Sequence, residues 1–184
     1  MAITTLNNRS INRSDTASAD QVWTATSATA SDFQAGGGGK VLQVVTATHA
    51  TIVTQTANAY VTSGLTASIT PTSTSNKVAI MTGFNVETYG DGSSSSGRVA
   101  PVALFRGDTT GTNLIEQVIG LSDRTASTST GTTGFNNVNF AYLDSPSTTS
   151  SQAYTVGISG SGATDIRAQP SSKKSSIILM EIEG

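Results

Sequence analysis

Few residues of this chain could do chemistry on their own. His49 is the only histidine and cysteine is absent, so disulfides, thiol catalysis and zinc–thiolate sites are excluded. A metal site needs three or four ligands, and His49 has no companions for one. A Ser–His–Asp triad would have to use His49, yet Ser and Asp are so abundant that their presence indicates nothing. We expect His49 on a strand surface, with no metal and no cofactor.

Carboxylates are the other candidates for chemistry. The chain has 12 Asp and Glu residues, and a pair of carboxylates could hydrolyse a glycosidic bond. Most of them stand beside Gly, Ser or Thr, as residues of turns do. Asp108 closes the tripeptide Arg106-Gly107-Asp108, which we interpret as a hairpin turn after a strand. The sequence therefore predicts a protein that is not an enzyme.

Composition indicates the fold class and excludes two kinds of partner. Among 184 residues, 12% are charged, Ser and Thr make up nearly a third, and Glu, Lys and Leu are few. This balance favours strands over helices. The net charge of -2 and the scattered basic residues argue against nucleic-acid binding. No run of 18 apolar residues is present, so no membrane insertion is expected.

Alternating apolar and polar residues predict a series of strands separated by turns. Pro101 lies inside one of these runs and predicts an edge strand or a bulge there. The pattern is typical of an all-β fold, a single antiparallel β-sandwich that is jelly-roll-like. The expected strands cover residues 40–46, 59–62, 65–70, 77–89, 98–106, 113–120, 137–142, 154–158 and 175–182.

The first 39 residues differ from the rest. Their only large aromatic residues are Trp23 and Phe33, which stand among Ser, Thr, Ala and Asn with no strong period. A run of four glycines, residues 36–39, then forms a flexible break. We predict an extended N-terminal arm with a Gly-rich hinge over residues 1–39 and a β-sandwich domain over residues 40–184. A disordered tail is the alternative for the arm.

Four segments resemble bacteriophage tail-fibre and virion surface proteins, such as those of marine podoviruses. Residues 20–34 resemble the connector that precedes the terminal domains of tail fibres, although Trp23 stands where the family has Leu. Residues 63–78 and 142–150 are similar to recurrent segments of phage β-sandwich domains. Residues 177–182 are similar to the usual terminus of these domains. The resemblance covers most of the chain from residue 20 onward.

This resemblance implies a non-enzymatic protein of the virion surface, with a homotrimeric C1q-like or jelly-roll domain. Its partners would be other virion proteins of the tail or capsid and a host cell-surface receptor or glycan. Only 39 residues precede the domain, too few to build a standing shaft. We therefore expect a short tail fibre or fibre tip that presents loops for receptor binding. The alternative is a capsid decoration protein, whose arm and domain edge stabilise the shell.

Two groups of residues are candidates for binding. In the arm, large apolar side chains that a partner protein could bury would anchor the chain to the virion, and these are Trp23 and Phe33. In the domain, Ser-rich and Thr-rich loops over residues 90–97 and 122–134 have the small, polar character of distal binding loops. The candidate binding residues of these loops are Asp91, Ser94, Thr128 and Thr130.

The C-terminal run over residues 175–182 is apolar on both faces, which is typical of a strand that is covered on both sides. We predict that Ile178, Met180 and Ile182 form the trimer seam, because a lean core without disulfides benefits from burial between protomers. Tyr142 and Tyr154 could belong to an aromatic platform for sugars. Since they alternate with polar and small residues on strands, we expect them in the core or at the seam.

Overall fold

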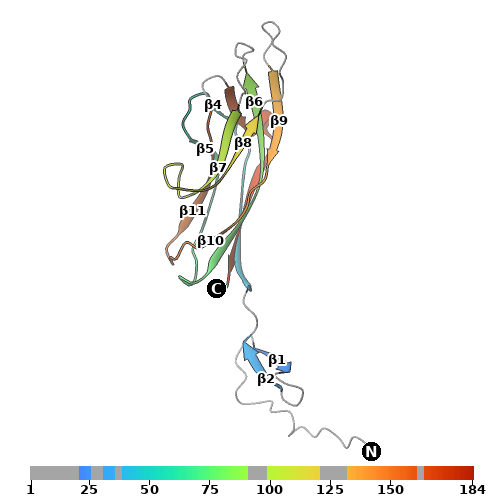
Figure 1. The fold of residues 1–184 in the computed structure, drawn as a ribbon, viewed down its shortest axis with the longest axis vertical. Helices are drawn as coiled ribbons and strands as arrows, with labels where there is room; N and C mark the ends of the chain where they lie inside the picture. The colour runs from blue at the N-terminus through green and yellow to red at the C-terminus, as the bar shows by residue number, and fades with distance from the viewer. Residues whose placement is uncertain (1–20, 26–30, 36–38, 91–98, 121–131, 161–163) are drawn as a thin grey trace, which may run out of the picture. The chain divides into compact units, whose positions relative to one another are not determined.

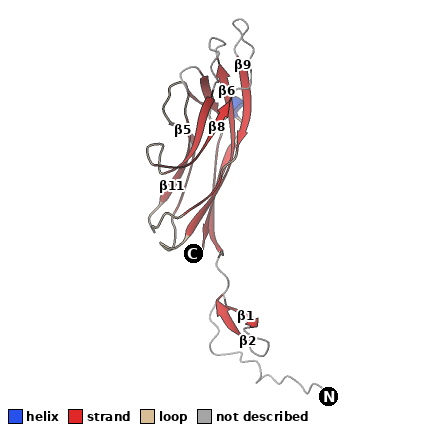
Figure 2. Cartoon of the chain, viewed as in Figure 1, coloured by secondary structure: helices blue, strands red, loops and turns tan. Residues whose placement is uncertain are grey.

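A computed structural model describes residues 21–25, 31–35, 39–90, 99–120, 132–160 and 164–184 (Figure 1). The chain divides into two compact units, Met1–Gly39 and Lys40–Gly184. Strands dominate the described residues, which also contain one short 3-10 turn, Pro170–Ser172 (Figure 2). No helix among the described residues is long and apolar enough to cross a membrane.

The N-terminal unit contains a short β-hairpin. Strand β1 (Gln21–Ala25) pairs antiparallel with β2 (Ser31–Ala35). No strong period marks these residues, and the sequence predicts an extended arm, with a disordered tail as the alternative. The pairing explains the weak signal, because a two-stranded sheet has no second layer whose core would impose an alternating pattern.

The second unit is a sandwich of two sheets, and its larger sheet is organised around β6 (Lys77–Gly90). The first half of β6 lies between β13 (Ser175–Ile182) and β10 (Ala141–Asp144). Strand β3 (Val41–His49) pairs with the other edge of β13. These four strands, in the order β3-β13-β6-β10, form what we call the first half-sheet.

The second half of β6 is flanked by different strands. Strand β12 (Thr164–Ala168) lies on one side and β9 (Thr132–Val138) on the other, and β4 (Val53–Gln55) pairs with β12. The order β4-β12-β6-β9 forms the second half-sheet. At 14 residues, β6 spans about 46 Å, so the two half-sheets lie end to end along one strand.

The smaller sheet has four antiparallel strands in the order β5-β11-β7-β8. Their bounds are Val61–Ile69, Gln152–Ile158, Val99–Arg106 and Thr112–Gly120. Alternate side chains of both sheets point into a common core, as the pleat of a strand requires. The fully buried apolar residues of this core include Leu65, Val78, Ile80, Phe84, Val86, Val102, Leu104, Val156, Ile158, Ile177 and Leu179. The predicted all-β, antiparallel sandwich is confirmed.

Three predictions about strands are wrong. The runs over residues 59–62 and 65–70 are not two strands, because β5 passes without a break from Val61 to Ile69. The run over residues 137–142 is not one strand, because β9 ends at Val138 and β10 begins at Ala141. Between them Phe140 and Thr82 exchange backbone and hydroxyl hydrogen bonds, and the chain passes from the second half-sheet to the first. Of the two alternatives for Pro101, the edge strand is wrong, since β7 lies between β11 and β8, and the irregularity of β7 lies further along, between Leu104 and Phe105. The proline is tolerated because the ladder to β11 begins only at Val102.

Candidate functional site

The structure places the two arm aromatics opposite each other. Trp23 of β1 and Phe33 of β2 are register partners at the centre of the five-residue ladder. Their role as the virion anchor stays a prediction.

The four loop residues lie outside the described part of the chain: Asp91, Ser94, Thr128 and Thr130. The strands that bracket their loops are described. Gly90 at the end of β6 pairs with Thr132 at the start of β9, and Val99 at the start of β7 pairs with Gly120 at the end of β8. The two loops are thus both bracketed by paired strand ends.

Strand β13 occupies a central position, between β3 and β6. Its alternate residues Ile177 and Leu179 are fully buried in the core. The predicted seam residues Ile178, Met180 and Ile182 lie on the opposite, outer face and are half-buried. The strand is therefore covered on its inner face only, within the single chain.

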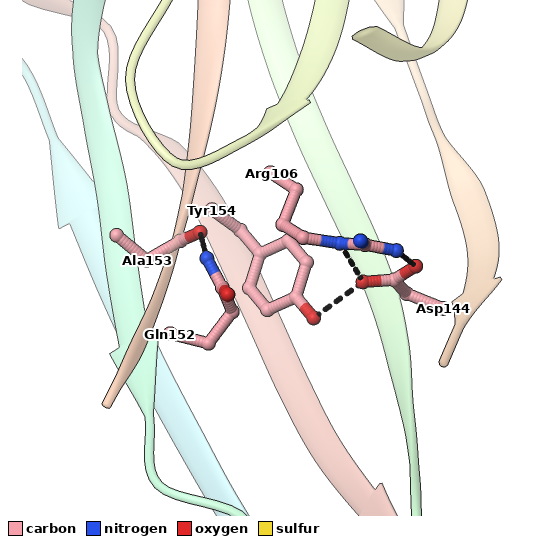
Figure 3. Close-up of polar contacts among 5 residues, drawn as sticks. All are labelled: Arg106, Asp144, Gln152, Ala153 and Tyr154. Carbon is pink, nitrogen blue, oxygen red and sulfur yellow. Dashed lines mark hydrogen bonds and ion pairs between the residues drawn. The ribbon is translucent and has the colours of Figure 1, made fainter. Parts of the chain in front are cut away.

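A polar cluster inside the sandwich joins the two sheets (Figure 3). Asp144 of β10 is 3% exposed and accepts a bidentate interaction from Arg106 of β7, with Nε 2.7 Å from Oδ2. The hydroxyl of Tyr154 on β11 donates to the same Oδ2 at 2.8 Å. Such bidentate, charge-assisted contacts are among the strongest hydrogen bonds in proteins. Asp144 therefore ties the first half-sheet to the smaller sheet.

The environment of this cluster fixes the charge of its members. Burial, and then the hydrogen bond to Asp144, raises the pKa of Tyr154 well above its usual range. The hydrogen bond to Asp144 also raises the pKa of Arg106. The tyrosine stays neutral and the guanidinium stays charged across the physiological range, so neither group is poised to exchange a proton near neutral pH. The cluster is built to hold two sheets together.

Glu181 forms a second buried polar site, near the C-terminal end of β13. The residue is fully buried, and its Oε1 accepts from the Thr72 backbone N–H at 2.6 Å, the Thr72 hydroxyl at 2.8 Å and Asn76 Nδ2 at 2.6 Å. Gln43 Nε2 donates to Oε2 at 2.6 Å. Burial raises the pKa of Glu181, but these four hydrogen bonds outweigh it and lower the pKa to about 2. The buried Glu181 carboxylate, hydrogen-bonded by neutral donors only among these contacts, thus links β13 to the turn before β6.

Asp144 and Glu181 were not predicted to be structural residues. Each has the same strand parity as an inward-facing neighbour, half-buried Tyr142 for Asp144 and buried Leu179 for Glu181. That parity was available from the sequence. The partners were not, because the Arg106–Asp144 pair is separated by 38 residues and the Asn76–Glu181 pair by 105. Tyr154, expected in the core or at a seam, is a core residue.

His49 and Asp108 have local structural roles. The His49 imidazole lies against Gly64, whose φ of +82° and lack of a side chain leave room for the ring. Asp108 caps the turn after β7, accepting from the Thr110 N–H at 2.9 Å and hydroxyl at 2.6 Å. The hairpin-turn interpretation of the Arg106-Gly107-Asp108 tripeptide is therefore confirmed, and Arg106 itself turns toward Asp144. In the described residues, no group of three His, Asp or Glu could hold a metal ion.

Comparison with known proteins gives distant likenesses only. No family model and no curated protein matches the sequence. Among solved structures, VP2 of the infectious bursal disease virus subviral particle is similar with a TM-score of 0.40 and 13% identity, over 90% of this chain and 38% of VP2. A Bacillus endospore appendage protein, of disulfide-linked pili, has a TM-score of 0.29 and 13% identity, over 83% of this chain and 99% of that one. The chain spans well under half of VP2, and likenesses this distant carry no argument about function.

Proposed function

We propose that this chain is a non-enzymatic surface protein of a bacteriophage virion, a homotrimeric short tail fibre or fibre tip that presents loops to a host receptor or glycan. The observation that carries the proposal is the polarity of the β-sandwich. The chain enters the domain at Lys40, directly before β3. The first residue of β3, Val41, lies in the same cross-strand row as Lys77, so the entry point is at the start of β6. At the other end of β6, Gly90 is the last residue before the loop over residues 91–98. Its cross-strand partner, Thr132, is the first residue after the loop over residues 121–131.

This polarity suits an adhesin. The length of β6, about 46 Å, separates the end where the arm joins from the end where the two long Ser-rich and Thr-rich loops begin. Loops presented by a rigid scaffold are the usual carriers of binding function. The resemblance of residues 20–34 to the connector that precedes tail-fibre terminal domains supports the same orientation, with the arm toward the virion.

Adsorption of the purified, fluorescently labelled chain to host cells tests receptor binding. We expect saturable binding that competes with the parent phage. Replacing residues 121–131 by a Gly–Ser segment of equal length, together with Asp91→Ser in the other loop, should abolish binding and leave the circular dichroism spectrum unchanged. A matched control carries Thr149→Gly and Ser150→Gly in the exposed turn between β10 and β11, at the other end of the sandwich. If the loop variant binds as well as the control, these loops do not contact the receptor.

Antibody labelling of intact virions tests the location. A tail fibre places label at the tail, in tens of copies or fewer per particle. Label distributed over the head in hundreds of copies would instead establish capsid decoration, the alternative function. Absence of the chain from purified virions would overturn both.

A further inference from the structure

The outer faces of the two half-sheets have opposite chemical character. On the second half-sheet the outer face is polar: Arg167 forms a 3.7 Å ion pair with Glu87 of β6, and Asn137 Nδ2 donates to Asn85 Oδ1 at 3.2 Å. The large apolar residue on this face is Phe135, which is 71% exposed beside Glu87. A polar outer face is the ordinary pattern for an antiparallel sheet in contact with water.

Over most of its length the outer face of the first half-sheet is apolar across all four strands, and the row of Thr48, Ser176 and Gly83 next to the second half-sheet is small and polar. One row reads Val44, Met180, Ala79 and Leu143, and the next reads Thr46, Ile178, Met81 and Ala141. Val44, Met81 and Leu143 are 56%, 44% and 54% exposed. Ile182 continues the apolar surface between Val41, 48% exposed, and Lys77. We call the apolar residues of these rows the apolar face: Val41, Val44, Ala79, Met81, Ala141, Leu143, Ile178, Met180 and Ile182.

The other layer of the sandwich has no such surface at the same end. The outward residues of β5 are small and polar: Thr62, Thr66 and Ser68. Phe105 of β7, opposite Thr155 of β11, is an apolar residue that points outward. The ring of Tyr60 covers it, packed edge-on at a centroid distance of 5.0 Å. Val99 and Val118, 40% and 54% exposed, lie at the other end of the smaller sheet, so at this end the continuous apolar surface belongs to the first half-sheet. Contiguous exposed apolar surface of this kind marks an interaction site.

We infer that the apolar face packs against the same face of two further copies of this chain around a threefold axis, an inference that rests on the proposed homotrimer and identifies its interface. The interior of the face has no charged residue, so it needs no partner of complementary charge. Large and small residues alternate across it, since Met180 lies beside Ala79 and Met81 lies beside Ala141. A face with these properties is complementary to its own copies.

The width of the apolar face fits a threefold arrangement. Packed sheets lie about 10 Å apart, so each of three sheets around a threefold axis lies about 5 Å from the axis. Three planes at this distance enclose an equilateral triangle with sides of about 17 Å, which is the width available to each sheet. Four strands at about 4.8 Å spacing span about 14 Å, and side chains extend this further. Met180 and Ala79 are in the two middle strands and fall nearest the axis. Lys77 lies at the margin, where its ammonium can reach water.

Chemical cross-linking at Met180 tests the geometry, because the chain has no cysteine of its own. In the full-length Met180→Cys variant, a short bis-maleimide joins two thiols, so it should link two chains of each trimer and leave the third chain without a thiol to react with. The linked fraction of the protein should therefore level off near two-thirds. The matched variant Ser68→Cys, on the outer face of β5, should give almost no linked product. Complete linkage of Met180→Cys into pairs would indicate a twofold dimer and overturn the threefold assignment.

Charge insertion tests the interface by mass. By sedimentation, the unmodified chain should have three times its 18.7 kDa mass. Met180→Lys and Leu143→Lys should each sediment as folded monomers, because each would bury an unpaired ammonium group in an apolar interface, and the three groups of Met180→Lys would also meet near the axis. The control Phe135→Lys, on the polar second half-sheet, should remain trimeric. Trimeric Met180→Lys and Leu143→Lys would overturn this interface and leave the proposed fibre trimer intact, whereas a monomeric unmodified chain would overturn the trimer and this inference together. The virion-labelling experiment decides the proposed location independently.

Discussion

Tyr154 and Asp144 belong to different sheets and meet inside the sandwich, where the Tyr154 hydroxyl donates a 2.8 Å hydrogen bond to Asp144 Oδ2. Arg106 fills the remaining acceptor positions of the carboxylate. Tyr154 is fully buried and Asp144 is 3% exposed. Since a buried carboxylate that loses a donor keeps the cost of its desolvation, this contact fixes how the two sheets sit on each other.

The Tyr154→Phe variant should lose about 1.5–3 kcal/mol of unfolding free energy, the usual value for a hydrogen bond to a charged group. The ring volume is unchanged, so the loss reports the hydroxyl alone. Urea unfolding followed by circular dichroism measures it. Tyr142→Phe, a half-buried tyrosine on β10, is the matched control and should change stability by less than about 0.5 kcal/mol. Equal losses of unfolding free energy in the two variants would show that the hydrogen bond from Tyr154 to Asp144 does not stabilise the domain in the way expected.

Glu181 should make the protein sensitive to acid in a defined range. The pKa of Glu181 is about 2 in the folded chain and 4.5 in its ordinary, solvated state, so the unfolded state takes up the proton first as the pH falls. The stabilisation from this group is complete above pH 4.5 and disappears as the pH falls toward 2. Unfolding free energies measured from pH 7 to pH 2 should therefore decline over that interval.

The Glu181→Gln variant separates this group from the other carboxylates. Its amide cannot ionise, and its NH₂ group would face the donors of Asn76 and Thr72, so we expect a loss of about 2–3 kcal/mol at pH 7. The difference between the two proteins should be constant above about pH 5 and shrink below it. A difference that does not change with pH would contradict the lowered pKa.

Gly157 should not accept a methyl group. A Cβ at this position would lie 2.7 Å from Phe105 Cε2 and 3.0 Å from Thr109 Cγ2, and the Phe105 ring cannot retreat because Tyr60 packs against it. Gly157→Ala should destabilise the domain by about 1–3 kcal/mol. Gly83→Ala is the control, since the nearest atom to its Cβ, Ser176 Oγ, is 3.4 Å away. Thermal unfolding of the pair measures the difference, and a Gly157→Ala protein as stable as Gly83→Ala would contradict the close packing.

Deleting residues 1–35 should leave the domain folded. The chain divides into compact units at Gly39 and Lys40, and the sandwich core is formed by residues after that point. The melting temperature should be nearly unchanged, while incorporation into virions should be lost if Trp23 and Phe33 anchor the chain. The double variant Trp23→Ala and Phe33→Ala should reproduce the loss of incorporation. Truncated protein that still enters virions would place the anchor on the β-domain.

Much of the domain could be predicted from local pattern. The expected runs over residues 77–89, 113–120, 154–158 and 175–182 coincide with strands β6, β8, β11 and β13. Two strands with weak signals, β4 and β12, were missed. Strand β4 has three residues, and β12 carries one buried Ile between Asp165 and Arg167. Segments this short hold too few apolar residues for a period of two to be recognised.

The sequence by itself determined the all-β class, the turn at Asp108 and the alternation that places Ile177 and Leu179 on one face of β13 and Ile178 and Met180 on the other. These features depend on neighbouring residues and on the pleat of a strand, which any extended segment shares. Because β13 is apolar on both sides, alternation could not decide which face is the core.

Only the tertiary structure decided that, by pairing β13 with β3 and β6 and placing the smaller sheet over Ile177 and Leu179. It also brought Arg106 and Tyr154 to Asp144, and Thr72 and Asn76 to Glu181. Side chains far apart along the chain carry no mark of their partners in a single sequence. Their meeting depends on the order of strands in two sheets, and that order is fixed by the packing of the whole core.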